Sequence, residues 1–372
     1  MIQITDKKDC CGCSSCVQKC PKQCISLKED NEGFLYPVVD KESCIDCGLC
    51  EKVCPVLHQG EPHKPLQVYA AKNKDEEIRR QSSSGGIFTL LAEKVIHEGG
   101  VVFGARFDER WEVRHDYTET VEGLAAFRGS KYVQSKIDTT FKIVEKFLKE
   151  GRIVLFTGTP CQISGLDHFL LKEYDKLFKV EVACHGVPSP KIWKEYLQAL
   201  NLNNIGFISH KDKSTGWRSY SFSIKNTNGN LLFSERASEN KYLMAFVRNL
   251  IIRPSCFSCP SKLSYTKADI TIADYWGIEN LVPQMDDNKG TSFICCNTRK
   301  GKKLVEEANF KLIQADFQKS VPYNPCIVKS TEEPVERQLF LNNYEKNGIN
   351  ALFSLKKQKQ NILKRMIKRI LR

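Results

Sequence analysis

The chain has 372 residues, 41% of them hydrophobic, which is enough apolar material for two or three folded units and argues against global disorder. Its net charge of +12 is uneven, because residues 355–372 carry eight Lys and Arg and no acid, which leaves +4 for the rest. A charge gathered in one tail is poor evidence for nucleic-acid binding, so we expect no nucleic-acid partner. No run of 18 apolar residues and no export signal is recognised, so we expect a cytoplasmic protein whose 17 cysteines are mostly metal-bound thiolates.

Two cysteine runs dominate residues 1–60. Both have the spacing C-x2-C-x2-C-x3-C-P, which is typical of bacterial two-cluster ferredoxins, where the fourth cysteine of each run binds the other cluster. We therefore predict a domain with two [4Fe–4S] clusters at 1–60. The first cluster is expected to use Cys10, Cys13, Cys16 and Cys54. The second is expected to use Cys44, Cys47, Cys50 and Cys20.

Two more cysteines in this region do not fit the runs. Cys11 stands at the wrong distance from Cys13, and Cys24 lies beyond the proline, so both are interpreted as spare thiols. Structural zinc is a poorer explanation of the runs, because zinc sites favour two ligand pairs separated by a long insert. Two neighbouring cubanes form a short path for electrons, so the remaining residues should supply what lies at its far end.

After a linker at 58–65, residues 66–205 alternate expected strands and helices, which is typical of an α/β domain. Strands are expected at 66–72, 101–107, 152–157 and 177–183, and helices at 86–97, 137–148 and 190–200. From about residue 205 the pattern is richer in strands, with candidates at 217–225, 231–233, 268–274 and 291–297. We therefore expect a second region at 206–335, and an α+β fold in which a small ferredoxin-like domain precedes a mixed α/β domain.

Four segments carry a family resemblance. They are RQSSSGGIF at 80–88, RGSKYVQS at 128–135, FTGTPCQ at 156–162 with ACHGVPS at 183–189, and CFSCP at 256–260 with DITIADYWG at 269–277. Through these segments, residues 67–330 resemble the coenzyme F-420 hydrogenase/dehydrogenase beta-subunit family. The resemblance implies FAD, a third [4Fe–4S] cluster, and electron transfer between clusters and an organic two-electron acceptor or donor. Coenzyme F-420 itself is not implied by any particular residue.

The candidates for the third cluster are Cys161, Cys184, Cys256 and Cys259. The first two follow expected strands, where a loop at a sheet edge presents ligands, and the last two form a Cys-x2-Cys pair. The alternative is four buried free thiols. Three other cysteines are interpreted as packing residues: Cys295, Cys296 and Cys326.

The flavin candidates begin with a loop before an expected helix. Bare amides, hydroxyls and the positive helix end would suit a phosphate group, although an ordinary helix cap explains the same serines. Lys131 could neutralise that phosphate, lie beside the flavin ring or be a solvated lysine, and Tyr132 could be core packing. No G-x-G-x-x-G motif or P-loop is present, which argues against a standard nicotinamide site. The candidate flavin-binding residues are Ser83, Ser84, Gly85, Gly86, Gly129, Ser130, Lys131, Tyr132, Gln134, Gly158, Thr159, Pro160 and Gln162.

His185 is the candidate catalytic residue, since histidine titrates near neutral pH and could donate a proton. Alternatively, His185 could donate a hydrogen bond that tunes a cluster sulfur, or it could be an ordinary turn residue. We expect an FAD- and iron–sulfur-dependent oxidoreductase that acts on a small-molecule substrate or exchanges electrons with a redox partner protein. The alternative is a non-catalytic relay subunit that serves a partner enzyme. Some relatives are associated with cell-surface polysaccharide genes, so that pathway is one setting for it.

The C-terminal tail, residues 350–372, is expected to end in an amphipathic helix. Apolar residues recur at helical spacing among Lys and Arg: Ile362, Leu363, Met366, Ile367, Ile370 and Leu371. Such a helix could lie on an anionic membrane surface, as a peripheral contact at the inner face. It could equally dock on the protein's own body or on a partner subunit.

Overall fold

The cysteine-rich N-terminus folds into a small unit, the N-terminal module (residues 1–60). In the computed structural model, which describes residues 1–262 and 266–356, β1 (Ile25–Glu29) pairs antiparallel with β2 (Leu35–Val39). A short 3-10 helix, η1 (Lys7–Asp9), precedes the first cysteine run, and helices α1 (Ser15–Lys19) and α2 (Leu49–Lys52) each begin inside a run. The residues before these helices, Ser14 and Gly48, have left-handed φ angles of 63° and 69°. This sharp turn lets cysteines before and inside each helix face the same space.

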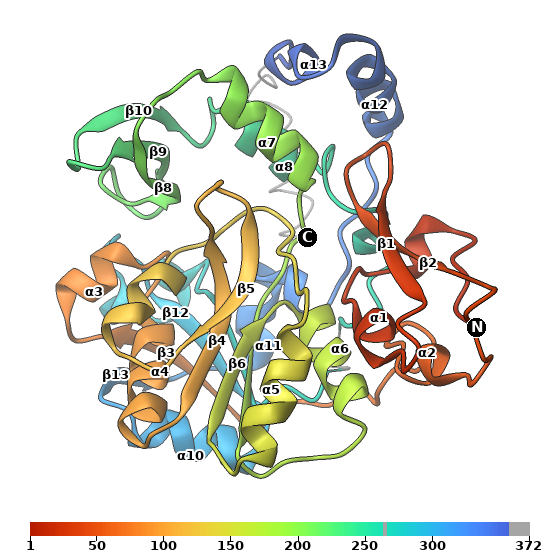
Figure 1. The fold of residues 1–372 in the computed structure, drawn as a ribbon. Helices are drawn as coiled ribbons and strands as arrows, with labels where there is room; N and C mark the ends of the chain where they lie inside the picture. The colour runs from red at the N-terminus through yellow and green to blue at the C-terminus, as the bar shows by residue number, and fades with distance from the viewer. Residues whose placement is uncertain (263–265, 357–372) are drawn as a thin grey trace.

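An eight-stranded sheet forms the body, in the order β13-β3-β12-β11-β7-β6-β4-β5 (Figure 1). Its centre, β11-β7-β6-β4, is parallel, and the outer pairings are antiparallel. Strands from both sides of residue 205 therefore share one sheet. The strands are β3 (Gln67–Asn73), β4 (Val101–Phe107), β5 (Val113–Thr118), β6 (Val154–Gly158), β7 (Leu177–Val182), β11 (Ile270–Asp274), β12 (Ser292–Cys296) and β13 (Phe310–Gln314).

Helices cover both faces of this sheet. Successive strand residues point to opposite faces, so Val102 of β4 packs with α4 (Ile87–His97) and α10 (Arg299–Glu307). Phe103 packs on the other face with α5 (Thr140–Lys149) and α6 (Pro160–Leu170). Because both faces are buried, β4 and β6 are apolar almost throughout. Shorter helices flank the sheet: α3 (Glu76–Gln81), α9 (Ile278–Leu281) and α11 (Phe317–Ser320).

A second, three-stranded antiparallel sheet lies above the first in Figure 1. It consists of β8 (Ile205–Asp212), β9 (Ser221–Asn226) and β10 (Leu231–Arg236). An aromatic core that includes Trp193, Tyr196, Phe222 and Tyr242 joins it to neighbouring helices. These are α7 (Pro190–Ala199), α8 (Lys241–Val247), α12 (Glu336–Asn347) and α13 (Asn350–Phe353).

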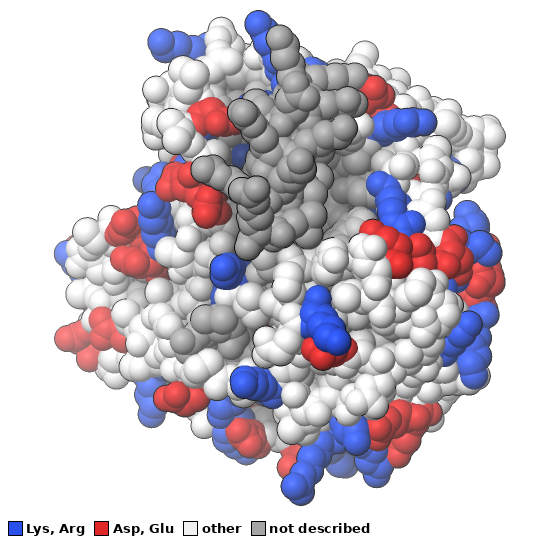
Figure 2. All heavy atoms as spheres, turned by 180° about the vertical axis from the view of Figure 1, so that it is seen from behind, with Lys and Arg blue, Asp and Glu red and all other residues white. Residues whose placement is uncertain are grey.

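The strands and helices expected from the sequence are confirmed to within a few residues. The helix expected at 137–148 begins only at Thr140, after Asp138 takes a left-handed φ of 45°. Several elements were not expected, among them β5, α6, β8 and β13. The predicted amphipathic helix lies outside the described residues beyond Lys356. Within the described part of the chain, no helix is long and apolar enough to cross a membrane. Among the residues coloured in Figure 2, acidic and basic side chains are interspersed, mainly around the edge of the face.

The N-terminal module docks on helices α5 and α6 (Figure 1). The Ser15 hydroxyl donates to the carbonyl oxygen of Gly165 over 2.7 Å, and a Cβ on Gly165 would stand 2.7 Å from the Cβ of Cys13. The Gln18 side chain accepts from the backbone N–H of Phe141 over 3.0 Å, at the start of α5. Glycine at 165 is thus what allows a cysteine-bearing loop to approach α6 so closely.

Candidate functional site

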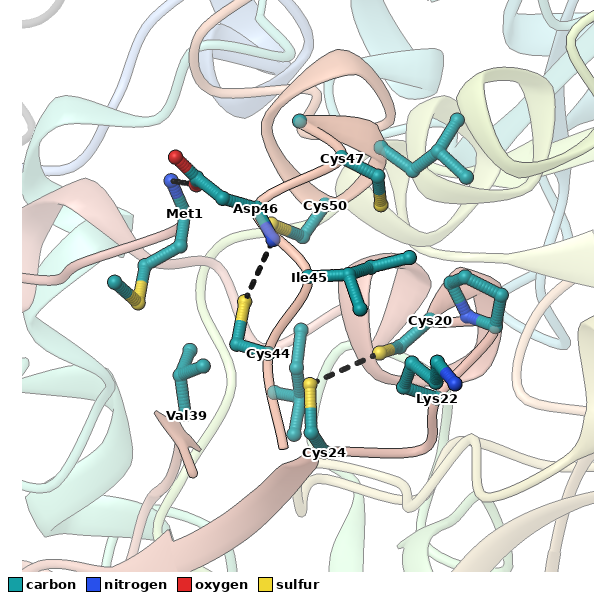
Figure 3. Close-up of a pocket in the computed structure, with 14 residues that line it drawn as sticks. Met1, Cys20, Lys22, Cys24, Val39, Cys44, Ile45, Asp46, Cys47 and Cys50 are labelled. Carbon is teal, nitrogen blue, oxygen red and sulfur yellow. Dashed lines mark hydrogen bonds and ion pairs between the residues drawn. The ribbon is translucent and has the colours of Figure 1, made fainter. Parts of the chain in front are cut away.

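Five thiols line a cavity of about 350 Å³ in the N-terminal module. Cys20 ends the first run, Cys24 lies just after it, and Cys44, Cys47 and Cys50 come from the second run (Figure 3). The structure therefore brings together the four cysteines expected to bind the second cluster. It also places the unassigned Cys24 in the cavity, with its Sγ 3.4 Å from that of Cys20. Backbone N–H groups of Ile2 and Asp46 donate to the Cys50 and Cys44 sulfurs over 3.2 and 3.4 Å, contacts that would stabilise thiolates.

The four cysteines expected to bind the first cluster are also neighbours. Burial raises the pKa of the Cys16 thiol, and the adjacent Cys13, Cys10 and Cys54 raise it further. Across residues 1–262 and 266–356, no group of three or more His, Cys, Asp or Glu is arranged around one metal ion. A single zinc ion would hold every sulfur at about 2.3 Å from one point. A cubane binds each thiolate through a different iron atom and so takes ligands that stand further apart.

A third set of cysteines lines a cavity of about 400 Å³ in the body, which we call the body cavity. Cys161 opens α6 directly after β6, and Cys184 follows the neighbouring parallel strand β7, so both lie at the carboxyl edge of the sheet. Cys256 and Cys259 come from the short 3-10 helix η3 (Pro254–Ser258) and its end. All four cysteines implied by the family resemblance therefore meet at one cavity.

Cys11 joins the body cavity to the N-terminal module. It lines this cavity, and the interactions of its thiol with Cys13 of the first set and Cys161 of the third raise its pKa. The interaction with Cys11 lowers the pKa of the Cys161 thiol to about 6, with help from the Thr159 hydroxyl at 3.2 Å. Cys11 was predicted to be a spare thiol. Its position between two cysteine sets depends on module docking and has no signal in the sequence.

Two buried cations lie beside these cysteines, and sequence reasoning missed both. Lys262 is 6% exposed and donates to the carbonyl oxygens of Cys184 and Cys326, the latter over 2.7 Å. Burial alone would lower the pKa of Lys262, but Cys184, Cys259 and other nearby thiols raise it overall. Arg253 is 1% exposed and donates to the carbonyl oxygen of Cys10 over 2.7 Å. A site for a negatively charged cluster benefits from such charges.

His185, the candidate proton donor, lies on the wall of the body cavity. Its Nε2 pairs with the side-chain oxygen of Asn249 over 2.6 Å, and its ring packs edge-on against Phe246 at 5.4 Å. Burial lowers the pKa of His185. This placement beside the cysteines, with one ring nitrogen held by Asn249, suits an imidazole that is neutral near pH 7.

The first two family segments meet at a pair of serines. The Ser83 hydroxyl accepts from the backbone N–H of Ser130 over 2.6 Å and shares a hydrogen bond with the Ser130 hydroxyl at 2.8 Å. Gly129, beside them, is exposed with a φ of +79°, and a Cβ there would meet no atom within 4 Å. Lys131 donates to the carbonyls of Ala126 and Arg128, and burial lowers its pKa to about 7. We call this region the Ser83–Ser130 corner. Its two serine hydroxyls and Lys131 lie near the unfilled space beside Gly129.

Other candidate flavin-binding residues make hydrogen bonds within the protein or shape its backbone. The Ser84 hydroxyl donates to Thr291 O over 2.9 Å, and Gly85 N–H donates to the Ser292 hydroxyl over 2.9 Å. Gly86 is the left-handed residue that opens α4. Lys213, which was not predicted, donates to the carbonyl oxygens of Arg79, Ser84 and Lys289. These hydrogen bonds anchor the loop that contains Ser83 and Ser84.

The remaining candidates lie near the cysteines or in the core. Thr159 and Gln162 form a capping box at the start of α6, where Pro160 lines the body cavity and Gly158 ends β6. Gln134 donates to Cys11 O over 3.2 Å and accepts from Arg253, so it contacts the N-terminal module. Tyr132 packs against Phe246 at 4.9 Å and near His210. The structure thus separates the Ser83–Ser130 corner from a second group around α6.

Comparison with known families identifies both parts of the chain. Residues 9–57 match a 4Fe-4S dicluster domain, which makes this an iron–sulfur electron-transfer protein. Residues 68–142 and 151–316 match the N-terminal and C-terminal parts of the coenzyme F420 hydrogenase/dehydrogenase beta subunit. The chain belongs to the coenzyme F420 hydrogenase/dehydrogenase beta-subunit family and carries an N-terminal dicluster domain.

A chain in the structure of the F420-reducing [NiFe] hydrogenase complex from Methanosarcina barkeri, described as a xenon derivative, is among the similar solved structures. It is 20% identical with a TM-score of 0.48, and the match covers 68% of this chain and 83% of that one. No curated protein matches the chain.

Proposed function

We propose that the protein is an iron–sulfur flavoprotein oxidoreductase. Electrons pass among the second cluster, the first cluster, a third [4Fe–4S] cluster in the body cavity and FAD, and are exchanged there with an organic two-electron acceptor or donor. The two clusters of the dicluster domain are the part that the family match supports directly. The third cluster, FAD and the organic substrate are the further steps of the proposal.

The contact of Cys11 with both Cys13 and Cys161 is the observation that carries the relay. It means that a single buried residue, Cys11, lies between the first cysteine set and the third where the N-terminal module meets the body. The fit of the body cavity to a cluster rests on the four candidate ligand thiols among its five cysteines and on buried Lys262. Burial raises the pKa of Cys256 to about 12 and that of Cys259 to about 11, so without a metal these side chains would stay protonated thiols.

The corner formed by Ser83 and Ser130 is the proposed position of the FAD phosphates, with Lys131 as the neighbouring charge. Paired hydroxyls and the exposed backbone at Gly129 offer donors to a phosphate without rearrangement. FAD would supply the switch between one-electron and two-electron chemistry. His185 is proposed to hold a proton near the third cluster. In this proposal residues 66–205 supply the flavin site, and residues 206–335 supply half of the third cysteine set.

A relay subunit is the second candidate function. The family models describe beta subunits, and Cys47, at the second cysteine set, is solvent-exposed. An exposed ligand places the end of the electron path where a redox partner protein can reach it. In that case the chain would hand electrons to a partner enzyme and convert no substrate itself.

Iron and flavin content of the full chain, purified without oxygen and reconstituted with both, tests the proposal. Three clusters correspond to about twelve irons per chain, with one FAD. The double variant Cys256→Ser/Cys259→Ser should retain about eight irons. Cys295→Ser, in the buried strand β12 and away from the cavity, is the matched control and should retain all twelve. Eight irons and no flavin in the unmodified chain would refute the flavoenzyme. Substrate turnover with an artificial electron donor then separates an enzyme from a relay subunit.

A further inference from the structure

Arg253 is a buried arginine without an acidic partner. Its side chain is 1% exposed, and its acceptors in the part of the chain the structure describes are neutral groups or a thiol. The Nε donates to Cys10 O over 2.7 Å, Nη2 to Leu35 O over 2.9 Å, and Nη1 to the Gln134 side-chain oxygen over 3.0 Å. Burial of a charge that lacks a counter-charge is costly, so native proteins almost always pair such groups.

Within residues 1–262 and 266–356, no carboxylate pairs with Arg253. The guanidinium lies over the ring of Tyr36 at 4.3 Å and near that of Phe34 at 5.4 Å, and at 1% exposure it is shielded from water. The neighbouring groups able to carry negative charge are thiols and the Tyr36 phenol, and burial raises the pKa of that phenol. The Cys10 Sγ is 3.5 Å from Nη2, and Cys11 and Cys256 also interact with the arginine electrostatically. The unpaired charge therefore lies against Cys10 of the first set and also interacts with Cys256 of the third.

The close approach of Arg253 to the cysteine loop depends on the glycine at position 12. Gly12, between Cys11 and Cys13, has a φ of +72°, and a Cβ there would stand 2.8 Å from the Arg253 Nη1 and 2.7 Å from the Gln134 amide nitrogen. Any other residue at position 12 would be strained and would displace the guanidinium. The cysteine loop and the arginine thus fit together only in this arrangement.

The second cysteine set has different electrostatic surroundings. The charged groups that line its cavity are Lys22, which is exposed, Asp46 and the terminal amine of Met1. That amine is ion-paired with Asp46 and with Glu51, each at 3.2 Å. Exposed and paired charges are screened by water, whereas a buried unpaired one is not.

We propose that Arg253 is the counter-charge of the first cluster, a fixed positive charge that raises the reduction potential of this cluster above that of the second. Reduction adds one electron to a cluster and breaks no bond, so a nearby positive charge favours the reduced form. An electron is then transferred from the second cluster to the first. Electrons that enter at the surface of the N-terminal module therefore move toward the body. Arg253 acts on the cluster through its charge, so it is a positioning residue and not a catalytic one. The inference rests on Cys10, Cys13, Cys16 and Cys54 holding one cluster.

The test is a redox titration of the full, reconstituted chain with dithionite, followed by electron paramagnetic resonance. In Arg253→Gln, the reduction equilibrium of one cluster should shift at least tenfold toward the oxidised form, which is 59 mV for a one-electron couple. The potential of the second cluster, whose cavity Arg253 does not line, should stay in place. Arg253→Lys keeps the charge but loses the forked hydrogen bonds, so it should keep most of the potential. Arg152→Gln, a surface arginine paired with Glu119, is the control for the same change in net charge.

Gln134→Glu gives a second route that leaves Arg253 in place. It sets a carboxylate 3.0 Å from Nη1 with no change in side-chain shape, and so should lower the same potential as Arg253→Gln does. An unchanged potential in Gln134→Glu, or an equal shift in Arg253→Lys and Arg253→Gln, would overturn the inference. A chain with only eight irons but with the predicted shift would refute the third cluster and leave the role of Arg253 standing.

Discussion

Arg337 of α12 gives a sharp prediction about how the N-terminal module is held. Its guanidinium donates to the Glu32 carboxylate in the turn between β1 and β2, and to the carbonyl oxygen of Ile252 over 3.1 Å. The two side chains are only 6% and 14% exposed, and a second acidic partner of Arg337, Glu333, stands at 3.7 Å, so Arg337→Met leaves Glu32 buried without its main counter-charge. Removal of one partner from a buried pair costs about 3–5 kcal/mol. The remaining exposure of Glu32 puts the expected cost for Arg337→Met at about 3 kcal/mol, at the low end of that range.

Hydrogen exchange of amides in β1 and β2 measures this cost as the free energy of local opening. About 3 kcal/mol corresponds to exchange about a hundredfold faster in Arg337→Met. The double variant Glu32→Gln/Arg337→Met should recover most of the loss, because it removes both charges. Lys191→Met is the matched control, since the Lys191 amine reaches the same turn only through an exposed contact of 3.3 Å with Asn31 O. Exchange that rises less than about fivefold in Arg337→Met would refute the reasoning.

The same pair predicts a pH dependence with a definite sign. Burial raises the pKa of Glu32 even though Arg337 opposes the shift. A carboxyl with a raised pKa in the folded state favours docking at low pH, and this contribution is lost as pH rises from the unfolded pKa through the folded one. Without Arg337 the pKa should rise further, so opening of the turn in Arg337→Met should be slower at pH 5 than at pH 7. The opposite order would show that Glu32 is not buried in the docked state.

Three further changes test the cysteine sites. Cys24→Ser should leave the iron content unchanged, because four other thiols surround that cavity; a loss of about four irons would make Cys24 a ligand. Gly165→Val should cost about 1–3 kcal/mol by overlap with Cys13 and should speed the release of iron to a chelator, and an unchanged release rate would contradict the close approach. Lys262→Met should lower iron from about twelve to eight per chain, while the exposed control Lys267→Met keeps all of it; full iron in Lys262→Met would exclude Lys262 as a requirement for the third cluster.

The sequence predicted what depends on local spacing. The two cysteine runs differ from zinc patterns in the distances between neighbouring ligands, and the exchange of the fourth cysteine follows from the same spacing. The structure groups Cys20 with the second run, as that rule requires. The parallel strands were predictable for a similar reason, since β4 and β6 are short apolar runs bounded by turns.

The sequence could not predict what depends on docking. Gln134 and Gln162 lie inside family segments and were expected at the flavin, but the amide of Gln134 bonds the N-terminal module and that of Gln162 bonds Ser135 and Thr159. Arg253 and Lys262 carry no pattern that separates them from surface cations. One signal was available: each stands three residues from a cysteine of the Cys256–Cys259 pair.

That spacing of three has a structural consequence. Arg253 is the residue that caps the 3-10 helix η3, and its carbonyl oxygen accepts from the Cys256 N–H over 2.9 Å, so a single tight turn joins the two residues. Cys256 lines the body cavity while Arg253 reaches the loop of Cys10, and Cys259 and Lys262 continue toward the same cavity. The segment that completes the third cysteine set is therefore also the one that supplies charge to the first. A chain that assembled only one of these sites would leave either Arg253 or the Cys256–Cys259 pair without its partners, which ties formation of the body cavity to docking of the N-terminal module.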